Sequence, residues 1–218
     1  MHYSIVTIFP EMVHTFFGSG LIKKAVEKKI IGIDIYDLRE FADNKHKKTD
    51  DRPYGGGPGM VMKPEPLANA VNHIQKKKEG KIILFSANAE RLSQKKVKKL
   101  SEGNHFILIC GRYDGVDQRF IDKYVDEEIS IGEYVIMGGE LAAGVFVESV
   151  SRMIEGVIGN RESVETDSFF IDDQYGYPQY TMPRYFEDIG VPDVLVSGDH
   201  KKICDWRKKN QKSKNKSK

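Results

Sequence analysis

Residues 129–141 read Ile129-Ser130-Ile131-Gly132-Glu133-Tyr134-Val135-Ile136-Met137-Gly138-Gly139-Glu140-Leu141. A short β-prone run meets the single Gly132, a second apolar run meets the pair Gly138 and Gly139, and a helical pattern begins at Glu140. Glycine lets the backbone take φ > 0 and lets a flat ligand lie close to main-chain N–H and C=O groups. Residues 132–139, called here the glycine shelf, are therefore expected to hold a ligand, although two tight turns in a core would use glycines in the same way.

The sequence around the glycine shelf alternates between strand and helix patterns. Strands are expected at residues 3–9, 31–38, 81–85, 105–110 and 128–131, and helices at 11–29 (broken near Gly18 and Gly20), 64–78, 93–100, a short segment ending at 124, and 140–155. Residues 105–110 are apolar throughout, which is typical of a central parallel strand. This alternation predicts an α/β fold with a mostly parallel sheet, whose ligands bind beyond the carboxyl ends of the strands. Loops that begin at Ser86, Gly111 and Gly132 would meet at that edge.

Composition indicates a globular protein, with 39% hydrophobic and 30% charged residues. There is no apolar run as long as a membrane span and no signal-peptide pattern at the N-terminus, so we expect a cytoplasmic protein. Cys110 and Cys204 lie in an apolar run and a basic helix, which favours reduced thiols.

The C-terminal tail is strongly basic. Residues 201–218 contain nine Lys or Arg and one acid, Asp205, so this tail carries a charge of +8 and the first 200 residues carry −6, which gives the net charge of +2. Such a tail suits either nucleic acid binding or a disordered solubilising end.

Two further segments have a distinct composition. Residues 51–60 (Asp-Arg-Pro-Tyr-Gly-Gly-Gly-Pro-Gly-Met) lack the Lys-Ser/Thr ending of a phosphate-binding loop and do not follow a strand directly. Because Pro53 and Pro58 fix φ, we expect a structured loop that holds Arg52 and Tyr54 on a close-packed backbone. Residues 160–174 are polar and acidic without periodicity, and a basic amphipathic helix begins after Asp199. We therefore predict a first domain over residues 1–158, a flexible linker over 159–173 and a small helical domain over 174–218.

Several of these motifs occur in one order. They are the segment 51–60, Cys110-Gly111-Arg112-Tyr113, Ser130-Ile131-Gly132 with Tyr134-Val135, Gly138-Gly139-Glu140-Leu141, Asp167-Ser168-Phe169 and Ser197-Gly198. Together, the ordered set resembles the bacterial tRNA (guanine-N1)-methyltransferases, which are members of the SPOUT class. The resemblance runs from Ile5 to about Arg207, which is nearly the whole chain.

The resemblance implies a SPOUT fold, in which a mostly parallel sheet carries a trefoil knot formed by the three loops, with a small helical C-terminal domain that contacts tRNA. It implies S-adenosylmethionine (SAM) as the methyl donor and N1 of the guanine 3′ to the anticodon, position 37, as the acceptor. It also implies a homodimer in which one active site joins two subunits. The family's chemistry depends on magnesium, but no carboxylate cluster in this sequence has clear metal-ligand spacing, so we predict no metal residue.

The resemblance also assigns site residues. The donor would be bound by Ser86, Gly111, Asp114, Ser130, Ile131, Gly132, Glu133, Tyr134, Val135, Ile136, Gly138 and Gly139. Asp167 would be the general base, and Arg152 would stabilise charge that develops on guanine O6. From the residues alone, Arg152 fits a helical ion pair with Glu148, and Asp167 is one carboxylate among several. Capping of the following helix would explain Asp117 and could explain Asp114 too.

Two other functions stay open at this point. A different SPOUT enzyme that methylates ribose or another base would not need Asp167, and a non-catalytic RNA-binding module would bind tRNA without SAM. The chain departs from the family pattern at Ala87 and Ala142, where proline is usual, at Asp114, where glutamate is common, and at Met182, where arginine is expected. A lysine-rich end also replaces the family's longer one. We expect these departures to affect donor affinity and tRNA binding more than the type of reaction.

Overall fold

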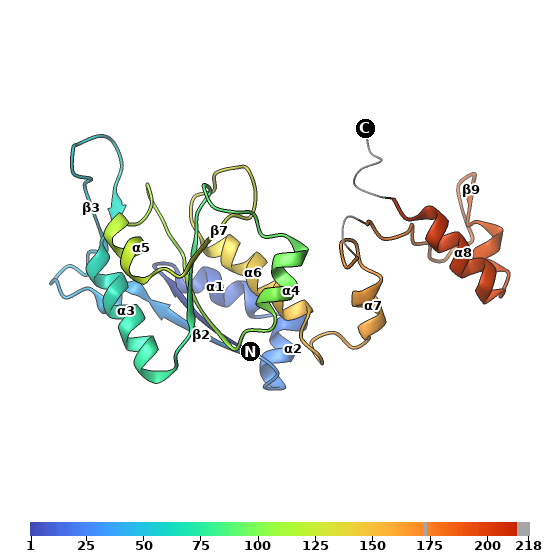
Figure 1. Ribbon diagram of the computed structural model, residues 1–218, viewed down its shortest axis with the longest axis horizontal. Helices are drawn as coiled ribbons and strands as arrows, with labels where there is room; N and C mark the ends of the chain where they lie inside the picture. The colour runs from blue at the N-terminus through green and yellow to red at the C-terminus, as the bar shows by residue number, and fades with distance from the viewer. Residues whose placement is uncertain (172–173, 213–218) are drawn as a thin grey trace. The chain divides into compact units, whose positions relative to one another are not determined.

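The centre of the fold is a five-stranded sheet in which every strand pair is parallel (Figure 1). The computed structural model describes residues 1–171 and 174–212. The sheet has the order β2-β1-β6-β5-β7. Its strands are β1 (His2–Thr7), β2 (Gly32–Asp37), β5 (Lys81–Phe85), β6 (His105–Ile109) and β7 (Glu127–Ile129). The prediction of a parallel sheet with residues 105–110 at its centre is confirmed.

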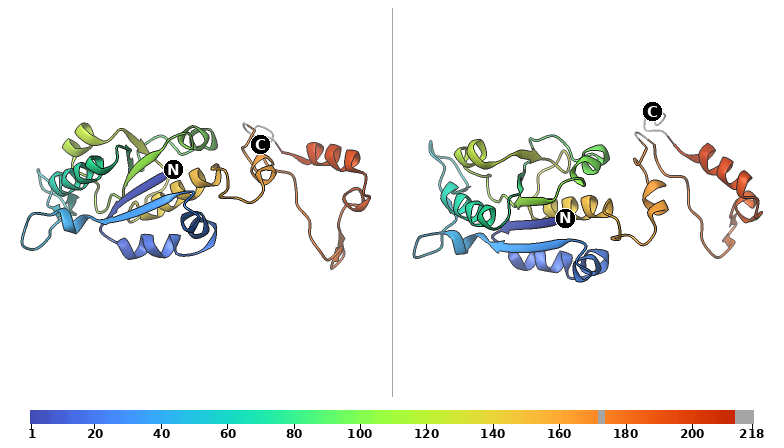
Figure 2. Two further views of the ribbon diagram at one scale, coloured as in Figure 1. Left: turned by 90° about the horizontal axis from the view of Figure 1, so that it is seen from below. Right: turned by 60° about the horizontal axis from the view of Figure 1, so that its bottom comes forward.

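Helices cover both faces of this sheet (Figure 2). One layer packs on one face and contains α1 (Pro10–Phe17), α2 (Gly20–Glu27), α4 (Gln94–Leu100) and α6 (Glu140–Arg152). The other layer contains α3 (Pro64–Lys77) and α5 (Gln118–Tyr124). Successive residues of a strand point to opposite faces. In β6, Phe106 and Leu108 accordingly join the first layer, and Ile107 and Ile109 the second.

Helix α6 is the best-anchored element of the first layer. Phe146 is fully buried, and its ring packs edge-on against Phe106, Phe85 and Tyr3 at centroid distances of 5.3, 5.9 and 6.4 Å. The Tyr3 hydroxyl and Ser151 Oγ are 2.9 Å apart, and burial raises the pKa of Tyr3. This packing holds the middle and the end of α6 against β1, β5 and β6.

Shorter elements complete residues 1–159. The 3₁₀ helix η1 (Leu38–Phe41) follows β2, and β3 (Asp50–Asp51) pairs antiparallel with β4 (Val61–Met62). Between β3 and β4, Gly55, Gly56, Gly57 and Gly59 all have φ > 0. The prediction of a close-packed backbone under Tyr54 is wrong, because this side chain is 99% exposed. The prolines fix their own φ, but a Cβ at Gly55, Gly56 or Gly57 would meet no atom of the described residues within 4 Å, so the tip of the loop is not closely packed.

The chain divides into two compact units, Met1–Gly159 and Asn160–Lys218. The second unit contains α7 (Arg161–Glu165), the hairpin β8 (Tyr185–Phe186) with β9 (Ile189–Gly190), η2 (Asp193–Val196) and α8 (His200–Asn210). The helix α7 lies where the sequence indicates only linker, because five residues are too few to show apolar periodicity. Asp172, Asp173 and the end of the basic tail, residues 213–218, lie outside the described residues.

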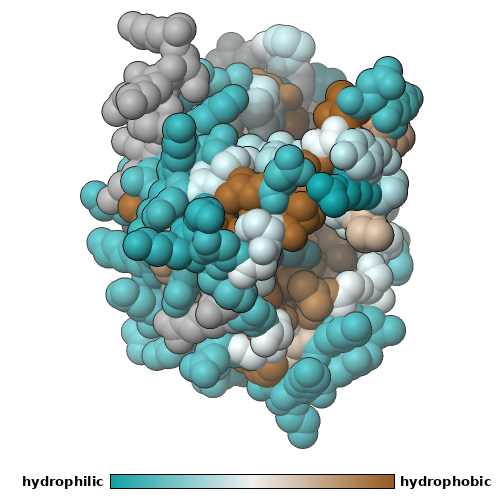
Figure 3. Space-filling model, turned by 90° about the vertical axis from the view of Figure 1, so that its right-hand side faces the viewer, coloured by the Kyte–Doolittle hydropathy of each residue, from teal (hydrophilic) through white to brown (hydrophobic). Residues whose placement is uncertain are grey.

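The surface is mainly hydrophilic, as the composition of a globular protein predicts. Hydrophilic residues dominate the face in Figure 3, with hydrophobic side chains gathered in its middle. Cys110 is buried and Cys204 exposed, and both thiols are free. Among the described residues, no helix combines the length and the apolar character that crossing a membrane requires.

Candidate functional site

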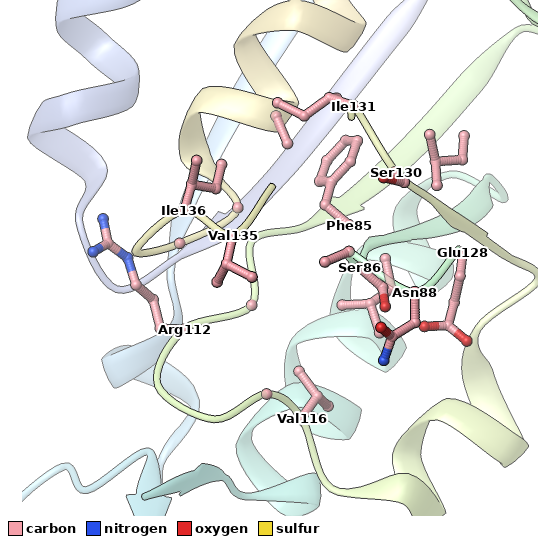
Figure 4. Close-up of a pocket in the computed structure, with 18 of the residues that line it drawn as sticks. Phe85, Ser86, Asn88, Arg112, Val116, Glu128, Ser130, Ile131, Val135 and Ile136 are labelled. Carbon is pink, nitrogen blue, oxygen red and sulfur yellow. The ribbon is translucent and has the colours of Figure 1, made fainter. Parts of the chain in front are cut away.

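Three loops at the carboxyl ends of β5, β6 and β7 enclose a cavity of about 470 Å³ (Figure 4). They are the loop that begins at Ser86, the loop 111–117 and the glycine shelf. The carboxyl ends of parallel strands meet at one edge of a sheet, which is why loops distant in sequence come together here. The volume lies within the ~300–1,000 Å³ that small-molecule pockets occupy.

The first loop is tied to the end of β7. The main-chain N–H of Ser86 donates to the Ile129 carbonyl at 3.1 Å, and the N–H of Leu92 donates to the Ser130 carbonyl at 2.8 Å. Asn88 lines the cavity from this loop, and Glu128 lines it from β7. In Figure 4 these two side chains lie on the same side of the cavity as Ser86. This side of the cavity is therefore polar.

The second loop, residues 111–117, is held by its contact with β4. The N–H of Met62 donates to the Gly115 carbonyl, and the N–H of Asp114 donates to the Met60 carbonyl, both at 2.9 Å. Tyr113 and Gly115 have φ of 59° and 116°. Burial and the neighbouring Asp50 carboxylate raise the pKa of Tyr113. The loop therefore has a defined conformation before any ligand arrives.

The helix cap after this loop is Asp117. Its carboxylate accepts a hydrogen bond from the N–H of Arg119 at 2.9 Å, where α5 begins. The Arg119 guanidinium also bonds this carboxylate and lowers the pKa of Asp117. Asp114 is exposed and lines the cavity instead. Capping therefore explains Asp117 but not Asp114.

The glycine shelf is shaped by close approach of its main chain. Ser130 is buried, and its hydroxyl donates to the Gly132 carbonyl at 3.0 Å and accepts from the Gly132 N–H at 3.2 Å. A Cβ at Gly132 would overlap the Tyr134 ring, which folds back over it. A Cβ at Gly139 would lie 2.7 Å from Cys110 Cα. At Gly111, in contrast, a Cβ would meet Val116, Leu84 and the Phe85 carbonyl at ordinary distances, so it would fill space that a ligand can use.

A buried ion pair lies beneath the shelf. Arg112 Nη2 and Glu140 Oε2 are 2.9 Å apart, and the Glu140 side chain is fully buried. Burial, together with the nearby Glu140 carboxylate, raises the pKa of the Cys110 thiol well above its usual value. Cys110 therefore stays protonated at neutral pH and is no nucleophile.

Comparison with known proteins identifies the family to which this chain belongs. Residues 1–218 match the family model described as tRNA (Guanine-1)-methyltransferase TrmD. The chain belongs to this family. Its fold is accordingly of the SPOUT class, and the sequence-based assignment of the family is confirmed.

Curated relatives named tRNA (guanine-N(1)-)-methyltransferase have similar sequences. The relative from Dictyoglomus turgidum is 48% identical over 212 residues, which cover 96% of this chain and 84% of the relative. The relative from Clostridioides difficile is 45% identical over 211 residues, covering 95% and 91% of the two chains. The relative from Geobacillus kaustophilus is 47% identical over 210 residues, covering 96% and 86%.

Most of the donor-binding residues that the family resemblance implies line the cavity together. They are Ser86, Gly111, Asp114, Ser130, Ile131, Gly132, Tyr134, Val135, Ile136, Gly138 and Gly139. Glu133 does not line it; its carboxylate pairs with the Arg91 guanidinium at 2.9 Å and is largely exposed. The family motif could not distinguish Glu133 from its neighbours, because the direction of each side chain in a glycine-rich loop depends on local φ and ψ.

The two residues predicted to be catalytic lie elsewhere. Arg152 is exposed at the end of α6 and lines a second depression, with a volume of about 530 Å³, between α1 and α6. Glu148 lines the same depression. Asp167 lies in the second unit, just after α7, where its N–H donates to the Val164 carbonyl at 3.3 Å. The Asp167 carbonyl accepts from the N–H of Phe170 at 3.3 Å, so the predicted base lies in a turn.

Several residues that line the cavity were not predicted from the sequence. They are Leu84, Phe85, Asn88, Arg112, Tyr113, Gly115, Val116, Gln118, Ile121, Glu128, Ile129 and Met137. Strand register offers a signal for Glu128, because it lies opposite Leu84 and therefore shares its side of the sheet. No such signal exists for Gln118 and Ile121, which reach the cavity through the packing of α5. Ala87 and Ala142, where the chain departs from the family pattern, line the cavity as well.

The lining combines apolar side chains with exposed main chain. Leu84, Val116, Ile121 and Ile136 offer apolar contacts to a flat ring, while the shelf offers N–H and C=O groups. Within residues 1–171 and 174–212, no three His, Cys, Asp or Glu side chains are grouped so that they could hold a metal ion. The cavity is thus suited to an organic ligand with one aromatic part and one polar part.

Proposed function

We propose that the cavity binds SAM and that the protein methylates N1 of the guanine at position 37, immediately 3′ to the anticodon, in tRNA. The observation that carries this proposal is the cavity itself, built by three loops of a chain that belongs to the tRNA (Guanine-1)-methyltransferase family. The alternatives of a different SPOUT enzyme and of an RNA-binding module without catalysis lack a comparable observation.

The residues of the cavity fit the donor. Gly111 leaves open the space that a Cβ would fill, and Leu84 and Val116 border that space. Ile131 and the shelf residues up to Gly138 would hold the adenine through main-chain groups, and Asp114 would orient the polar end. When bound, SAM supplies a methyl group on a positively charged sulfur.

The acceptor needs a base. Guanine N1 carries a proton at neutral pH, so its lone pair becomes available for the methyl group only when that proton leaves. The carboxylate of Asp167 would accept the proton. The turn that carries it is held by the N–H of Phe169, which donates to the Gln174 carbonyl at 2.6 Å, and by Ser168 Oγ, which accepts from the Gly176 N–H at 2.9 Å. A positioned base of this kind contributes about 10²–10⁴-fold in rate.

The acceptor also needs a cation. As N1 loses its proton, negative charge develops on O6, and a guanidinium held nearby would stabilise it. Arg152 is suited to this role because it is exposed at the rim of the depression on α6. An ion pair with Glu148 in the free protein would be compatible with that role, because both side chains line the same depression.

We further propose a homodimer through the apolar face of α1 and α6. Phe16, Leu141 and Val145 are 36%, 50% and 46% exposed there, and with Phe17 and Gly144 they line the depression beside Arg152. Exposed apolar surface of this kind is typical of protein interfaces. As the family resemblance implies, each active site would then be shared between two subunits, with Asp167 supplied by the second copy. A molecular mass of two chains by light scattering supports this arrangement, and a monomer that still methylates tRNA contradicts it.

The remaining proposals concern the roles of the domains, the cellular location and the dependence on magnesium. We propose that residues 1–158 form the knotted donor-binding domain, that residues 159–173 act as linker and that the C-terminal domain, residues 174–218, contacts tRNA. The basic helix α8 supports this last role, with the Arg207 guanidinium 4.9 Å from the Tyr177 ring centroid. A cytoplasmic location follows from tRNA as the substrate. Magnesium dependence stays a prediction, which methyl transfer with and without EDTA tests.

Transfer of labelled methyl groups tests the proposed function. Purified protein is mixed with labelled SAM and with tRNA transcripts that carry or lack the guanine at position 37. We expect transfer only to the transcript with this guanine. The Asp167→Asn variant should bind SAM normally and lose about 10²–10⁴-fold in kcat. The matched control Asp188→Asn, an exposed carboxylate of the same unit, should keep wild-type kcat.

Three outcomes would contradict the proposal. Equal transfer to both transcripts refutes the guanine at position 37 as the acceptor. Wild-type kcat in Asp167→Asn refutes the base and favours another SPOUT enzyme. Binding of tRNA without any uptake of SAM favours an RNA-binding module.

A further inference from the structure

Glu140 is a buried carboxylate that the proposed reaction does not use. It is 1% exposed at the first position of α6. Its Oε1 accepts from Thr7 Oγ1 at 2.7 Å, and its Oε2 accepts from Arg112 Nε at 2.9 Å. Thr7 Oγ1 in turn accepts from the N–H of Phe9 at 2.9 Å. Because a buried charge without partners is costly, this complete set of contacts indicates a fixed geometry.

Arg112 lines the cavity, but its side chain extends beneath the glycine shelf. Its guanidinium lies 4.4 Å from the Phe9 ring centroid, and its Nη1 donates to the Met137 carbonyl at 3.5 Å. A Cβ at Gly138 would overlap the Arg112 side chain, so the shelf needs glycine there for the guanidinium to pass. In Figure 4 the Arg112 head group points away from Ser86, Asn88 and Glu128. This cation is therefore used within the protein.

The ion pair joins two loops that both line the cavity. Arg112 belongs to the loop 111–117, and Glu140 directly follows the glycine shelf. At the same place, Arg112 and Gly138 form an antiparallel bridge, and the N–H of Gly139 donates to the Gly111 carbonyl at 2.8 Å. Main-chain bonds alone could slide or open, whereas the ion pair, in which Arg112 Nε and Nη2 both lie 2.9 Å from Glu140 Oε2, adds a fixed direction and distance.

We propose that Arg112 and Glu140 are positioning residues that hold the loop 111–117 and the glycine shelf at the separation that the methyl donor requires. The proposal rests on the function proposed above, since it takes SAM as the occupant of the cavity. Neither side chain needs to contact the donor. Thr7 orients the second carboxylate oxygen, which ties the pair to the end of β1.

Four variants test this role. Glu140→Gln keeps the shape of the side chain and leaves the Arg112 charge without its counter-ion, and Arg112→Met leaves Glu140 unpaired. The double variant removes both charges. The control is Glu127→Gln, which removes a carboxylate paired with Lys81 and Lys96 at 2.6 and 2.5 Å on β7. Glu127 does not line the cavity.

Hydrogen exchange of the donor-free protein is the first measurement. We expect faster exchange at residues 111–117 and 132–139 in both single variants and in the double variant, and wild-type exchange there in Glu127→Gln. The dissociation constant for SAM should rise about tenfold in the same three variants, a loss of about 1.4 kcal/mol. The stability to urea should recover in the double variant, because no unpaired charge remains buried, while donor affinity stays low.

Two results would overturn the positioning role. Exchange in the two loops that is unchanged in all variants shows that the main-chain bonds hold them without the ion pair. Exchange and donor affinity that both return to wild type in the double variant show that only the unpaired charge mattered. Failure of the wild-type protein to bind SAM would refute the proposed function instead, and exchange in the donor-free protein would still decide whether the pair holds the loops.

Discussion

Substitution of Gly139 by alanine tests how closely the glycine shelf approaches β6. The new Cβ would lie 2.7 Å from Cys110 Cα and 3.0 Å from the Gly111 nitrogen. Ordinary contact begins at 3.4 Å, so the two backbones must separate by about 0.7 Å. Both neighbours are main-chain atoms at the end of a buried strand, and no side-chain rotation can relieve the overlap.

The cost follows from these distances. Overpacking of a tight core costs about 1–3 kcal/mol. Stretching the 2.8 Å bond from the Gly139 N–H to the Gly111 carbonyl adds about 0.5–1.5 kcal/mol. The smaller entropy of the unfolded chain offsets about 0.4–1 kcal/mol. We expect Gly139→Ala to lower the free energy of unfolding by roughly 0.5–4 kcal/mol.

Urea unfolding followed by circular dichroism measures this change. The matched control is Gly159→Ala, because a Cβ there meets no atom of the described residues within 4 Å. The control should unfold at the wild-type urea concentration or slightly above it. If Gly139→Ala is as stable as Gly159→Ala, the two backbones are not in the contact described, and the reasoning about the shelf is wrong.

The other predictions concern titratable side chains. A thiol reagent at neutral pH should modify Cys204 quickly and Cys110 only after unfolding, because Cys110 is buried with a raised pKa; two fast-reacting thiols would contradict this. Burial lowers the pKa of His105, so the folded state favours its neutral form. This contribution to stability is present above the unfolded pKa of about 6.5 and is lost as the pH falls through the lower folded pKa. Urea unfolding between pH 7.5 and 5 should show this loss, and a His105→Gln variant should not.

Local patterns predicted the elements well. Ser93 and Asp199 were expected to start helices, and both side chains accept bonds from main-chain N–H groups, of Lys96 at 3.3 Å and of Lys202 at 3.1 Å. The break near Gly18 and Gly20 separates α1 from α2. These features depend on a few neighbouring residues, so the sequence contains all the information that they need.

The sequence patterns did not predict which distant segments of the chain pair with one another. Nothing in the patterns places β6 between β1 and β5, or brings Arg112 to Glu140 across 28 positions. Tyr54 illustrates a different limit. Its loop has the turn chemistry of a structured segment, but burial requires a packing partner, and local chemistry cannot supply one. The direction of the Glu133 side chain was unpredictable for the same reason.

The position of β6 has a consequence for synthesis on the ribosome. Strand β1 can pair with β2 as soon as β2 emerges from the ribosome. The other edge of β1 stays unpaired until β6 emerges, and β6 lies about 100 residues after β1 in the sequence. At roughly 5–20 residues per second, the nascent chain exposes that edge for about 5–20 s. Ile5 and Val6, both buried in the finished sheet, are accessible to chaperones or to other nascent chains during this interval. The site cannot begin to assemble before β6 arrives, because β6 leads directly into the loop that contains Gly111.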